Sequence, residues 1–223
     1  MHAEILDEHR LVLLETLTRL PSLKDCYLAG GTALSLQLGL RVSVDFDFFT
    51  QNRFNADAVF DTIRALFPST RVLHMDSDTC DLLVDDVQVS LFRYPYPLYE
   101  ETVNGQGRLA GLRMAGITDI AVMKLSAIGN RGSRKDFYDL YEIYMRCPDF
   151  TGDRLLDAAR SKFGEKTDLT YMLMSLTFFD DAETETLPKL FVQADWDEIK
   201  AFFREEQRHL FRLEEARFKK NLP

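Results

Sequence analysis

The segment VDFDF that begins at Val44 constrains the fold more than any other part of the chain, because apolar and acidic residues alternate strictly along it. Side chains in a β-strand point alternately to its two faces. The three apolar side chains therefore share one face, and Asp45 and Asp47 share the other. The pattern predicts a strand over Val44–Phe49 that packs on a core and carries two carboxylates on its opposite face.

Two carboxylates held side by side repel each other and raise each other's pKa unless a cation lies between them. Such hard oxygen ligands suit a divalent ion such as Mg²⁺ or Mn²⁺, and Mg²⁺ keeps several waters and completes its shell with substrate phosphates. Asp45 and Asp47 are therefore predicted to bind metal. An exposed strand face with no ligand is the alternative for a D-x-D pair that stands alone.

A glycine pair precedes this strand. Gly30 and Gly31 allow backbone N–H groups to approach an anion closely, and a helix that begins at Thr32 would direct its positive end to the same point. The segment matches neither G-x-x-x-x-G-K-[ST] nor G-x-G-x-x-G, so a P-loop or dinucleotide fold is disfavoured. A turn is the alternative for the glycines alone, but together with the two aspartates they predict adjacent phosphate and metal sites.

Composition limits the setting in which the protein works. The chain has 223 residues, 46% of them hydrophobic, so it can bury a sizeable core without disulfides. Its cysteines have neither disulfide-framework nor zinc spacing: Cys26, Cys80 and Cys147. The N-terminus lacks the features of a signal peptide, and no segment has the roughly 20 apolar residues of a membrane span. We expect a soluble, cytoplasmic protein with no membrane partner.

The pattern of the chain changes near residue 115. The first part alternates helical and strand signals, with helices expected over about 5–20, after Gly31 and near 56–66, and strands at 27–29, 71–75, 81–84 and 87–92. From Thr118 onward the pattern is helical, with Thr118 and Ser133 as expected N-caps. The fold class predicted is α+β, with an α/β core over 1–115 and a helical portion over 116–223 that packs on the core and completes the site.

Charge is distributed unevenly. The net charge of −9 argues against a surface that binds nucleic acid all over, but Lys and Arg outnumber Asp and Glu over 113–146. Arg131, Arg134 and Lys135 form a basic turn in this region, which either contacts RNA or a triphosphate or is an ordinary solvated cluster.

Several motifs together resemble the AbiEii-type nucleotidyltransferase toxins, a family of the polymerase-beta-like nucleotidyltransferase superfamily. The resemblance is carried by GGTALSLQLG, RVSVDFDFF, MKLSAIGNRGSRKDFYDLYEIY at 123–144 and, less strongly, YPYPL at 94–98. It implies a nucleotidyltransferase-like mixed sheet with packed helices and a helical C-terminal portion.

The resemblance also implies roles for individual residues. Those expected to contact the nucleotide are Gly30, Gly31, Thr32, Arg41 and Lys124, and those expected to be catalytic are Asp45, Asp47, Lys124 and Asp136. Many superfamily members have a third carboxylate on a later strand, where this chain has Ser90 in VQVSLF, so Asp136 is expected to replace it.

Both residues from the later motif have ordinary alternatives. Lys124 could extend from an apolar helix to solvent. Asp136 could pair with Arg134 or Lys135, and we expect Asp136 and Asp139 on different faces of their helix.

The function expected is Mg²⁺-dependent transfer of a nucleoside monophosphate from an NTP to an acceptor hydroxyl. The resemblance points to the toxin of a type IV-like toxin–antitoxin pair that acts on tRNA or other RNA and has a cognate antitoxin protein. The alternatives are a small-molecule, aminoglycoside-like nucleotidyltransferase or kinase, and a catalytically lapsed nucleotide-binding module, which the serine at position 90 favours.

Overall fold

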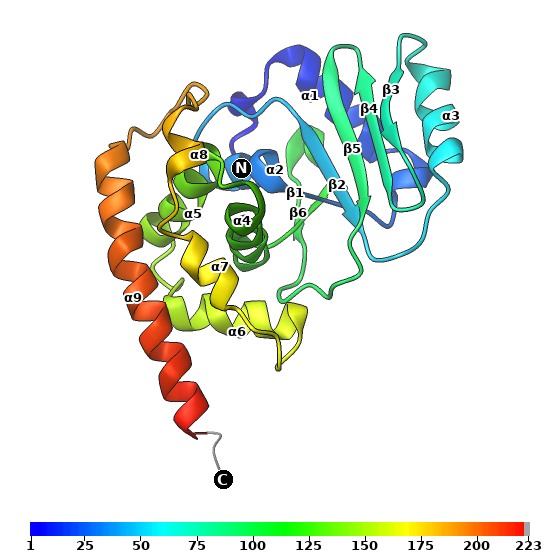
Figure 1. Cartoon of the computed structure of the whole chain (residues 1–223). Coiled ribbons are helices and arrows are strands. Elements are labelled where there is room, and N and C mark those ends of the chain that lie inside the picture. The colour runs from blue at the N-terminus through cyan, green and yellow to red at the C-terminus, as the bar shows by residue number, and fades with distance from the viewer. Residues whose placement is uncertain (221–223) are drawn as a thin grey trace. The chain divides into compact units, whose positions relative to one another are not determined.

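The computed structural model describes residues 1–220 and divides the chain into two compact units, Met1–Gly116 and a second that begins at Ile117. Figure 1 shows that every strand belongs to the first unit and that the second is built from helices.

Unit 1 is organised around one mixed sheet of seven strands in the order β3-β4-β5-β2-β1-β7-β6. The pairs β2–β5 and β1–β7 are parallel and the other neighbours are antiparallel. The strands are β1 (Tyr27–Ala29), β2 (Phe46–Thr50), β3 (Arg71–Met75), β4 (Thr79–Val84), β5 (Val87–Arg93), β6 (Val103–Asn104) and β7 (Arg113–Met114).

Strand β2 lies in the interior of this sheet, between β1 and β5. Phe46 and Phe48 are 0% and 2% exposed, whereas Asp47 between them is only half-buried. The alternation in the sequence is thus an alternation between a buried face and a face that keeps contact with solvent. Asp47 is opposite Ala29 of β1 and Ser90 of β5.

Helices flank the sheet of unit 1. They are α1 (Glu8–Thr18), α2 (Gly30–Leu38) and α3 (Ala56–Leu66), with short 3-10 turns at Ala3–Ile5, Pro21–Leu23 and Gly107–Leu109. The side chain of Asp7 caps α1 by accepting from the N–H of Arg10 at 2.8 Å, and Asn55 caps α3 in the same way. Helix α2 packs against β1 and β2, and α3 packs against β4.

Unit 2 is arranged around α4, which contacts α5, α6 and α7. Its helices are α4 (Ile117–Arg131), α5 (Arg134–Arg146), α6 (Gly152–Phe163), α7 (Thr170–Ser175), α8 (Asp180–Glu183) and α9 (Trp196–Lys220). The fully buried ring of Phe137 lies 5.2 Å from that of Phe179, 5.9 Å from that of Trp196 and 5.4 Å from that of Phe203. These rings join α5 to the start of α8 and to α9.

The predicted fold class is confirmed, and the differences concern the ends of some elements and two short strands. The strand expected from Val44 begins at Phe46, and the helix expected over about 5–20 is Glu8–Thr18. Thr118 is not an N-cap, because α4 already begins at Ile117. Strands β6 and β7 were not predicted, since two residues are too few to show an alternating pattern. None of the described helices combines the length and apolarity needed to span a lipid bilayer.

Candidate nucleotidyltransferase site

The glycine pair directly follows β1 and begins α2, so the helix expected from Thr32 starts two residues earlier, at Gly30. Gly30 has φ +67°, a left-handed conformation that favours glycine, and a Cβ added there would lie 2.8 Å from Oδ2 of Asp47. The N-cap residue of α2 is Ala29, whose side chain makes no capping hydrogen bond. The backbone of this junction and a carboxylate of the D-x-D pair are therefore neighbours, as the sequence predicted.

The segment between α2 and β2 is tied to this junction. Thr32 is buried, and its Oγ1 donates to the backbone oxygen of Asp45 at 2.5 Å and lies 2.8 Å from Oγ of Ser43. Arg41 is 3% exposed, and its guanidinium lies against Gly31 and donates from Nη1 to the backbone oxygen of Val42 at 3.2 Å. Thr32 thus supports the segment that carries the carboxylates, and Arg41 places a positive charge beside the glycines.

The two aspartates suit a divalent cation that also binds substrate. Asp45 directly precedes β2, Asp47 lies within it, and both are half-buried. Across the part of the chain that the structure describes, no group of three or more His, Cys, Asp or Glu side chains is arranged to hold a metal. Two carboxylates are nevertheless a donor set that fits Mg²⁺, because this ion commonly takes one or two protein carboxylates and completes its shell with water and phosphate oxygens.

A further carboxylate, that of Asp81, lies in one row with Asp47 across neighbouring strands, and the sequence analysis missed it. Asp47 of β2 is opposite Ser90 of β5, and Ser90 is opposite Asp81 of β4. Ser90 is 1% exposed and its Oγ donates to Oδ1 of Asp81 at 2.8 Å, while Nε2 of Gln88 donates to both Asp81 oxygens. The position of the expected third carboxylate is therefore a serine that is hydrogen-bonded to a carboxylate one strand further on.

A signal for this pairing was present in the sequence. The segment VDDV contains a two-residue hairpin turn, in which Asp85 and Asp86 have φ +46° and +64°. Counting outward from this turn places residue 81 opposite residue 90.

Lys124 and Asp136 meet inside unit 2, in a buried cluster of ion pairs. Nζ of Lys124 lies 2.9 Å from Oδ1 of Asp136 and 2.6 Å from Oδ2 of Asp139. Lys124 is 4% exposed, so the alternative in which it extends to solvent is wrong. The expectation that Asp136 and Asp139 occupy different faces is also wrong, because residues three apart on a helix are neighbours on one face.

Arg131 completes this cluster. Its Nε donates to Oδ2 of Asp136 at 2.9 Å and its Nη2 to Oδ1 at 3.2 Å. Burial would raise the pKa of Asp136, but the charges of Lys124 and Arg131, with the hydrogen bonds that both donate, lower it to about 2. The Asp136 carboxylate thus holds Lys124 and Arg131 in place, and the Arg131 side chain remains 59% exposed.

The other two residues of the basic turn are placed differently. The guanidinium of Arg134 lies 4.7 Å from the ring centroid of Trp196, and its Nη1 donates to the backbone oxygen of Glu185 at 3.0 Å. Lys135 is half-buried. Arg131 is thus the most exposed of the three cations, and Arg134 has contacts within unit 2.

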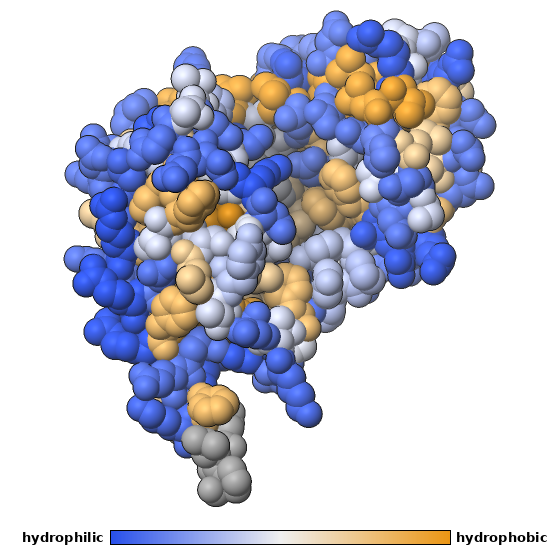
Figure 2. All heavy atoms as spheres, viewed as in Figure 1, coloured by the Kyte–Doolittle hydropathy of each residue, from blue (hydrophilic) through white to orange (hydrophobic). Residues whose placement is uncertain are grey.

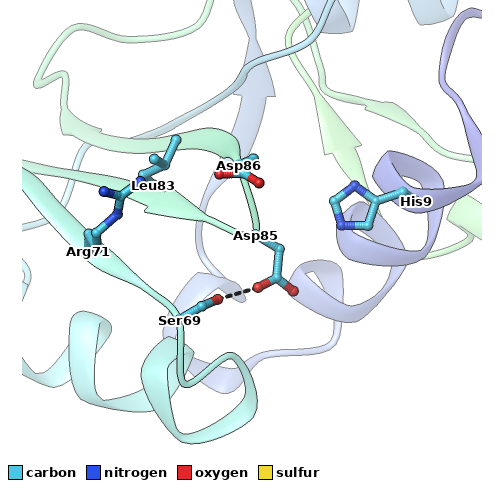
Figure 3. Close-up of a pocket in the computed structure, with 6 residues that line it drawn as sticks. All are labelled: His9, Ser69, Arg71, Leu83, Asp85 and Asp86. Atoms are coloured by element: carbon cyan, nitrogen blue, oxygen red, sulfur yellow. Dashed lines mark hydrogen bonds between the residues drawn. The ribbon is translucent and has the colours of Figure 1, made fainter.

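Unit 1 also contains a hollow of about 470 Å³ beside the β4–β5 turn (Figure 3). Asp85 is directed toward Ser69, whose Oγ donates to it, and His9 of α1 faces the same space. None of the residues predicted for catalysis lines this hollow.

Solved structures share this fold. MenT4, a nucleotidyltransferase toxin from Mycobacterium tuberculosis H37Rv, aligns with a TM-score of 0.56 and 16% identity over 91% of this chain and 84% of its own. JHP933 from Helicobacter pylori aligns with a TM-score of 0.54 and 17% identity over 99% of both chains. At these identities the likeness shows the fold alone.

Sequence comparison shows the family. An uncharacterized protein from Aquifex aeolicus (strain VF5) is 37% identical over 193 residues, which are 86% of this chain and 90% of the relative. The family model described as "Nucleotidyl transferase AbiEii toxin, Type IV TA system" matches residues 12–89 and 84–220. The chain belongs to the AbiEii family and is a nucleotidyltransferase, an enzyme whose substrate is an NTP.

Proposed function

We propose that the protein transfers a nucleoside monophosphate from an NTP to an acceptor hydroxyl with the help of Mg²⁺ or Mn²⁺. The observation that carries this proposal is the proximity of Gly30 to Oδ2 of Asp47, because it places the N-terminus of α2 beside a D-x-D pair. Phosphate and metal binding are needed together for this reaction.

In the proposed reaction the acceptor oxygen forms a bond to the α-phosphorus, the bond from that phosphorus to the bridging oxygen breaks, pyrophosphate leaves and the hydroxyl proton is released. The N–H groups at the start of α2 bind phosphate oxygens, and Arg41 adds positive charge at the same junction. Asp45 and Asp47 would hold the metal ion, which when bound neutralises negative charge on the phosphoryl oxygens. In unit 2, Lys124 is the residue proposed to bind phosphate, and Asp136 and Asp139 hold its buried ammonium group.

The acceptor proposed is tRNA or another RNA, and the biological role proposed is that of a toxin with a cognate antitoxin. The name of the family and the name of MenT4 support the toxin role. Because the chain has a net charge of −9, contact with RNA is expected to be local, and the exposed Arg131 is the leading candidate for it.

Membership of the AbiEii family argues against the alternative of a catalytically lapsed nucleotide-binding module. Ser90, which suggested that alternative, occupies the position of the expected third carboxylate and is bonded to Asp81. A small-molecule nucleotidyltransferase differs from the first proposal only in its acceptor, whereas a kinase would attack the γ-phosphorus, transfer that phosphoryl group and release NDP.

The test is incubation of the purified protein with each NTP labelled at the α-phosphate, Mg²⁺ and total RNA. Label is expected in RNA for the wild type, and Asp45→Asn or Asp47→Asn should abolish transfer without unfolding the protein, because each removes a metal ligand. Asp61→Asn is the matched control, since this carboxylate is exposed on α3, and it should keep full activity. A folded Asp47→Asn variant with wild-type activity would contradict the metal assignment. Label in small molecules alone would favour the alternative acceptor.

A further inference from the structure

A groove of about 380 Å³ lies beside the ion-pair cluster of unit 2. It is formed by the end of α4, by α7 and by the start of α8, and we call it the α4–α7 groove. The lining residues used below are Gly129, Arg131, Tyr171, Met174, Phe178 and Asp181. Figure 2 shows hydrophobic atoms at the surface around α7, next to hydrophilic ones.

The apolar wall of this groove is unusually exposed for side chains of its kind. Tyr171 is 69% exposed, Met174 is 60% exposed and Phe178 is 54% exposed. Large apolar side chains that cluster at a hollow indicate a binding surface more often than isolated exposed apolar side chains do.

The wall is also held in a defined position. Nε2 of Gln207, from α9, donates to the backbone oxygens of Leu173 and Met174 at 2.9 and 3.0 Å and to Oγ1 of Thr177 at 2.9 Å. Cε1 of Tyr171 lies 3.7 Å from the point where Gly129 would carry a Cβ, so the aromatic ring packs on a position without a side chain. The end of α7 is therefore fixed before any ligand arrives.

The polar residues of the groove indicate what kind of ligand it suits. Arg131 brings a guanidinium plane, and Asp181 brings a carboxylate that can accept from exocyclic amino groups. Aromatic faces, an arginine and a few hydrogen-bonding groups are the combination with which proteins bind unpaired nucleobases. A purely apolar peptide side chain would use neither the cation nor the carboxylate.

We propose that the α4–α7 groove binds an unpaired nucleobase, stacked on Tyr171 or Phe178 and contacted by Arg131. The proposal rests on the proposed function and deepens it, because the base belongs either to the NTP or to the end of the acceptor RNA. Arg131 connects the groove to the predicted catalytic residues of unit 2, since the same side chain is bonded to Asp136, which pairs with Lys124. A base in the groove is thereby positioned relative to the Lys124 ammonium.

The experiment measures binding rather than turnover, so it does not depend on whether transfer occurs. The affinities of the full chain are measured for three probes: NTPs, a short unpaired oligoribonucleotide and inorganic tripolyphosphate, which has no base. Tyr171→Leu and Phe178→Leu keep apolar area but remove the aromatic faces, and Tyr171→Phe keeps the face. Phe218→Leu is the matched control, because this ring is 69% exposed on α9 and lies outside the groove.

We expect Tyr171→Leu or Phe178→Leu to weaken binding of a base-containing probe by about 5- to 100-fold. Tripolyphosphate affinity should stay unchanged, and Tyr171→Phe and Phe218→Leu should behave as wild type. A loss confined to NTPs identifies the substrate base as the occupant, and a loss confined to the oligonucleotide identifies the acceptor base.

Equal affinities of all variants for both base-containing probes would overturn the proposal, as would an equal loss for tripolyphosphate. Failure of the proposed function is separate, because it appears as absence of label transfer by the wild type whatever the binding results.

Discussion

At the scale of single residues, Asp47 and Asp136, which were both predicted to be catalytic, have different surroundings. Asp47 lies half-buried beside the backbone of Gly30, in the part of unit 1 that we propose binds metal and phosphate. Asp136 is fully buried, and both its oxygens accept from the cations Lys124 and Arg131. The first arrangement suits a metal ligand, and the second suits a residue that positions two cations.

The pKa of Asp136 makes a prediction about acid stability. Since the pKa falls from an ordinary value of 3.8 to about 2 on folding, the ionised carboxylate stabilises the protein above pH 4, and this contribution is lost as the pH falls through 2. The contribution is about 2 kcal/mol. Asp136→Asn should therefore be less stable than wild type at pH 6 by about 3 kcal/mol, because the buried Lys124 loses one of its two carboxylate partners and Arg131 loses its own. Urea unfolding at pH 6 and at pH 2.5 should show the gap between the proteins narrowing in acid, and a gap that is independent of pH would contradict this account.

A substitution at Ser90 tests whether this position lies close enough to the proposed metal ligands to affect them. Ser90→Asp would place a third carboxylate between Asp47 and Asp81, and their repulsion should lower the melting temperature when no divalent ion is present. Mg²⁺ should then raise the melting temperature of this variant more than that of the wild type. Ser90→Ala is the control, since it removes one hydrogen bond to Asp81 and adds no charge, at a cost of about 1 kcal/mol. An identical response to Mg²⁺ in both variants would show that position 90 is too far from the metal ligands to affect them.

At the scale of elements, the turn from β1 to α2 links phosphate binding to the D-x-D strand. The antiparallel pairing of β1 and β2 places Ala29 opposite Asp47, so the residue that follows Ala29 must leave the sheet beside the carboxylate. The left-handed conformation of Gly30 allows this turn, and the absence of a side chain leaves room for Oδ2 of Asp47.

Two glycine substitutions distinguish the effect of backbone strain from an effect on catalysis at this turn, because both glycines have similar backbone conformations. Gly30→Ala and Gly107→Ala both introduce a Cβ at positive φ, +67° and +59°, and each should cost about 1 kcal/mol of unfolding free energy. Only the Cβ at position 30 would meet Asp47, whereas the one at position 107 would have no atom within 4 Å. Nucleotide transfer should therefore fall at least tenfold in Gly30→Ala and persist in Gly107→Ala. Equal activities in the two variants would remove the Gly30 turn from the proposed mechanism.

At the scale of the whole molecule, the predicted catalytic residues are divided between two compact units. Asp45, Asp47 and the glycine pair belong to Met1–Gly116, and Lys124 and Asp136 belong to the unit that begins at Ile117. Each unit has its own buried side chains, such as Phe46 in the first and Phe137 in the second.

This division predicts that residues 1–116 and 117–223, expressed separately, each unfold cooperatively on heating. Neither part should transfer nucleotide alone, because each contains only some of the residues that we propose for catalysis. Circular dichroism and the labelled-NTP assay provide the two measurements, with the full chain as control. Activity in residues 1–116 alone would show that Lys124 and Asp136 are dispensable.

The sequence by itself determined the features that depend on local periodicity. The alternation around Asp45 and Asp47 predicted a two-faced strand, the glycine pair predicted a turn into a helix, and the boundaries of α3 and β3 followed from the pattern of the segments at 56–66 and 71–75. These features could be predicted because the geometry of a strand or helix relates neighbours in the chain without reference to the rest of the fold.

Only the tertiary structure decided which distant side chains meet. Strand order places Asp81 in a row with Ser90 and Asp47, and the packing of α4 on α5 brings Lys124 to both Asp136 and Asp139. Burial of that lysine depended on such partners, since a charge leaves water only where opposite charges and hydrogen bonds replace it. A sequence shows that a lysine lies in an apolar helix. Whether its ammonium group extends to solvent or pairs with buried carboxylates depends on the helix that packs against it.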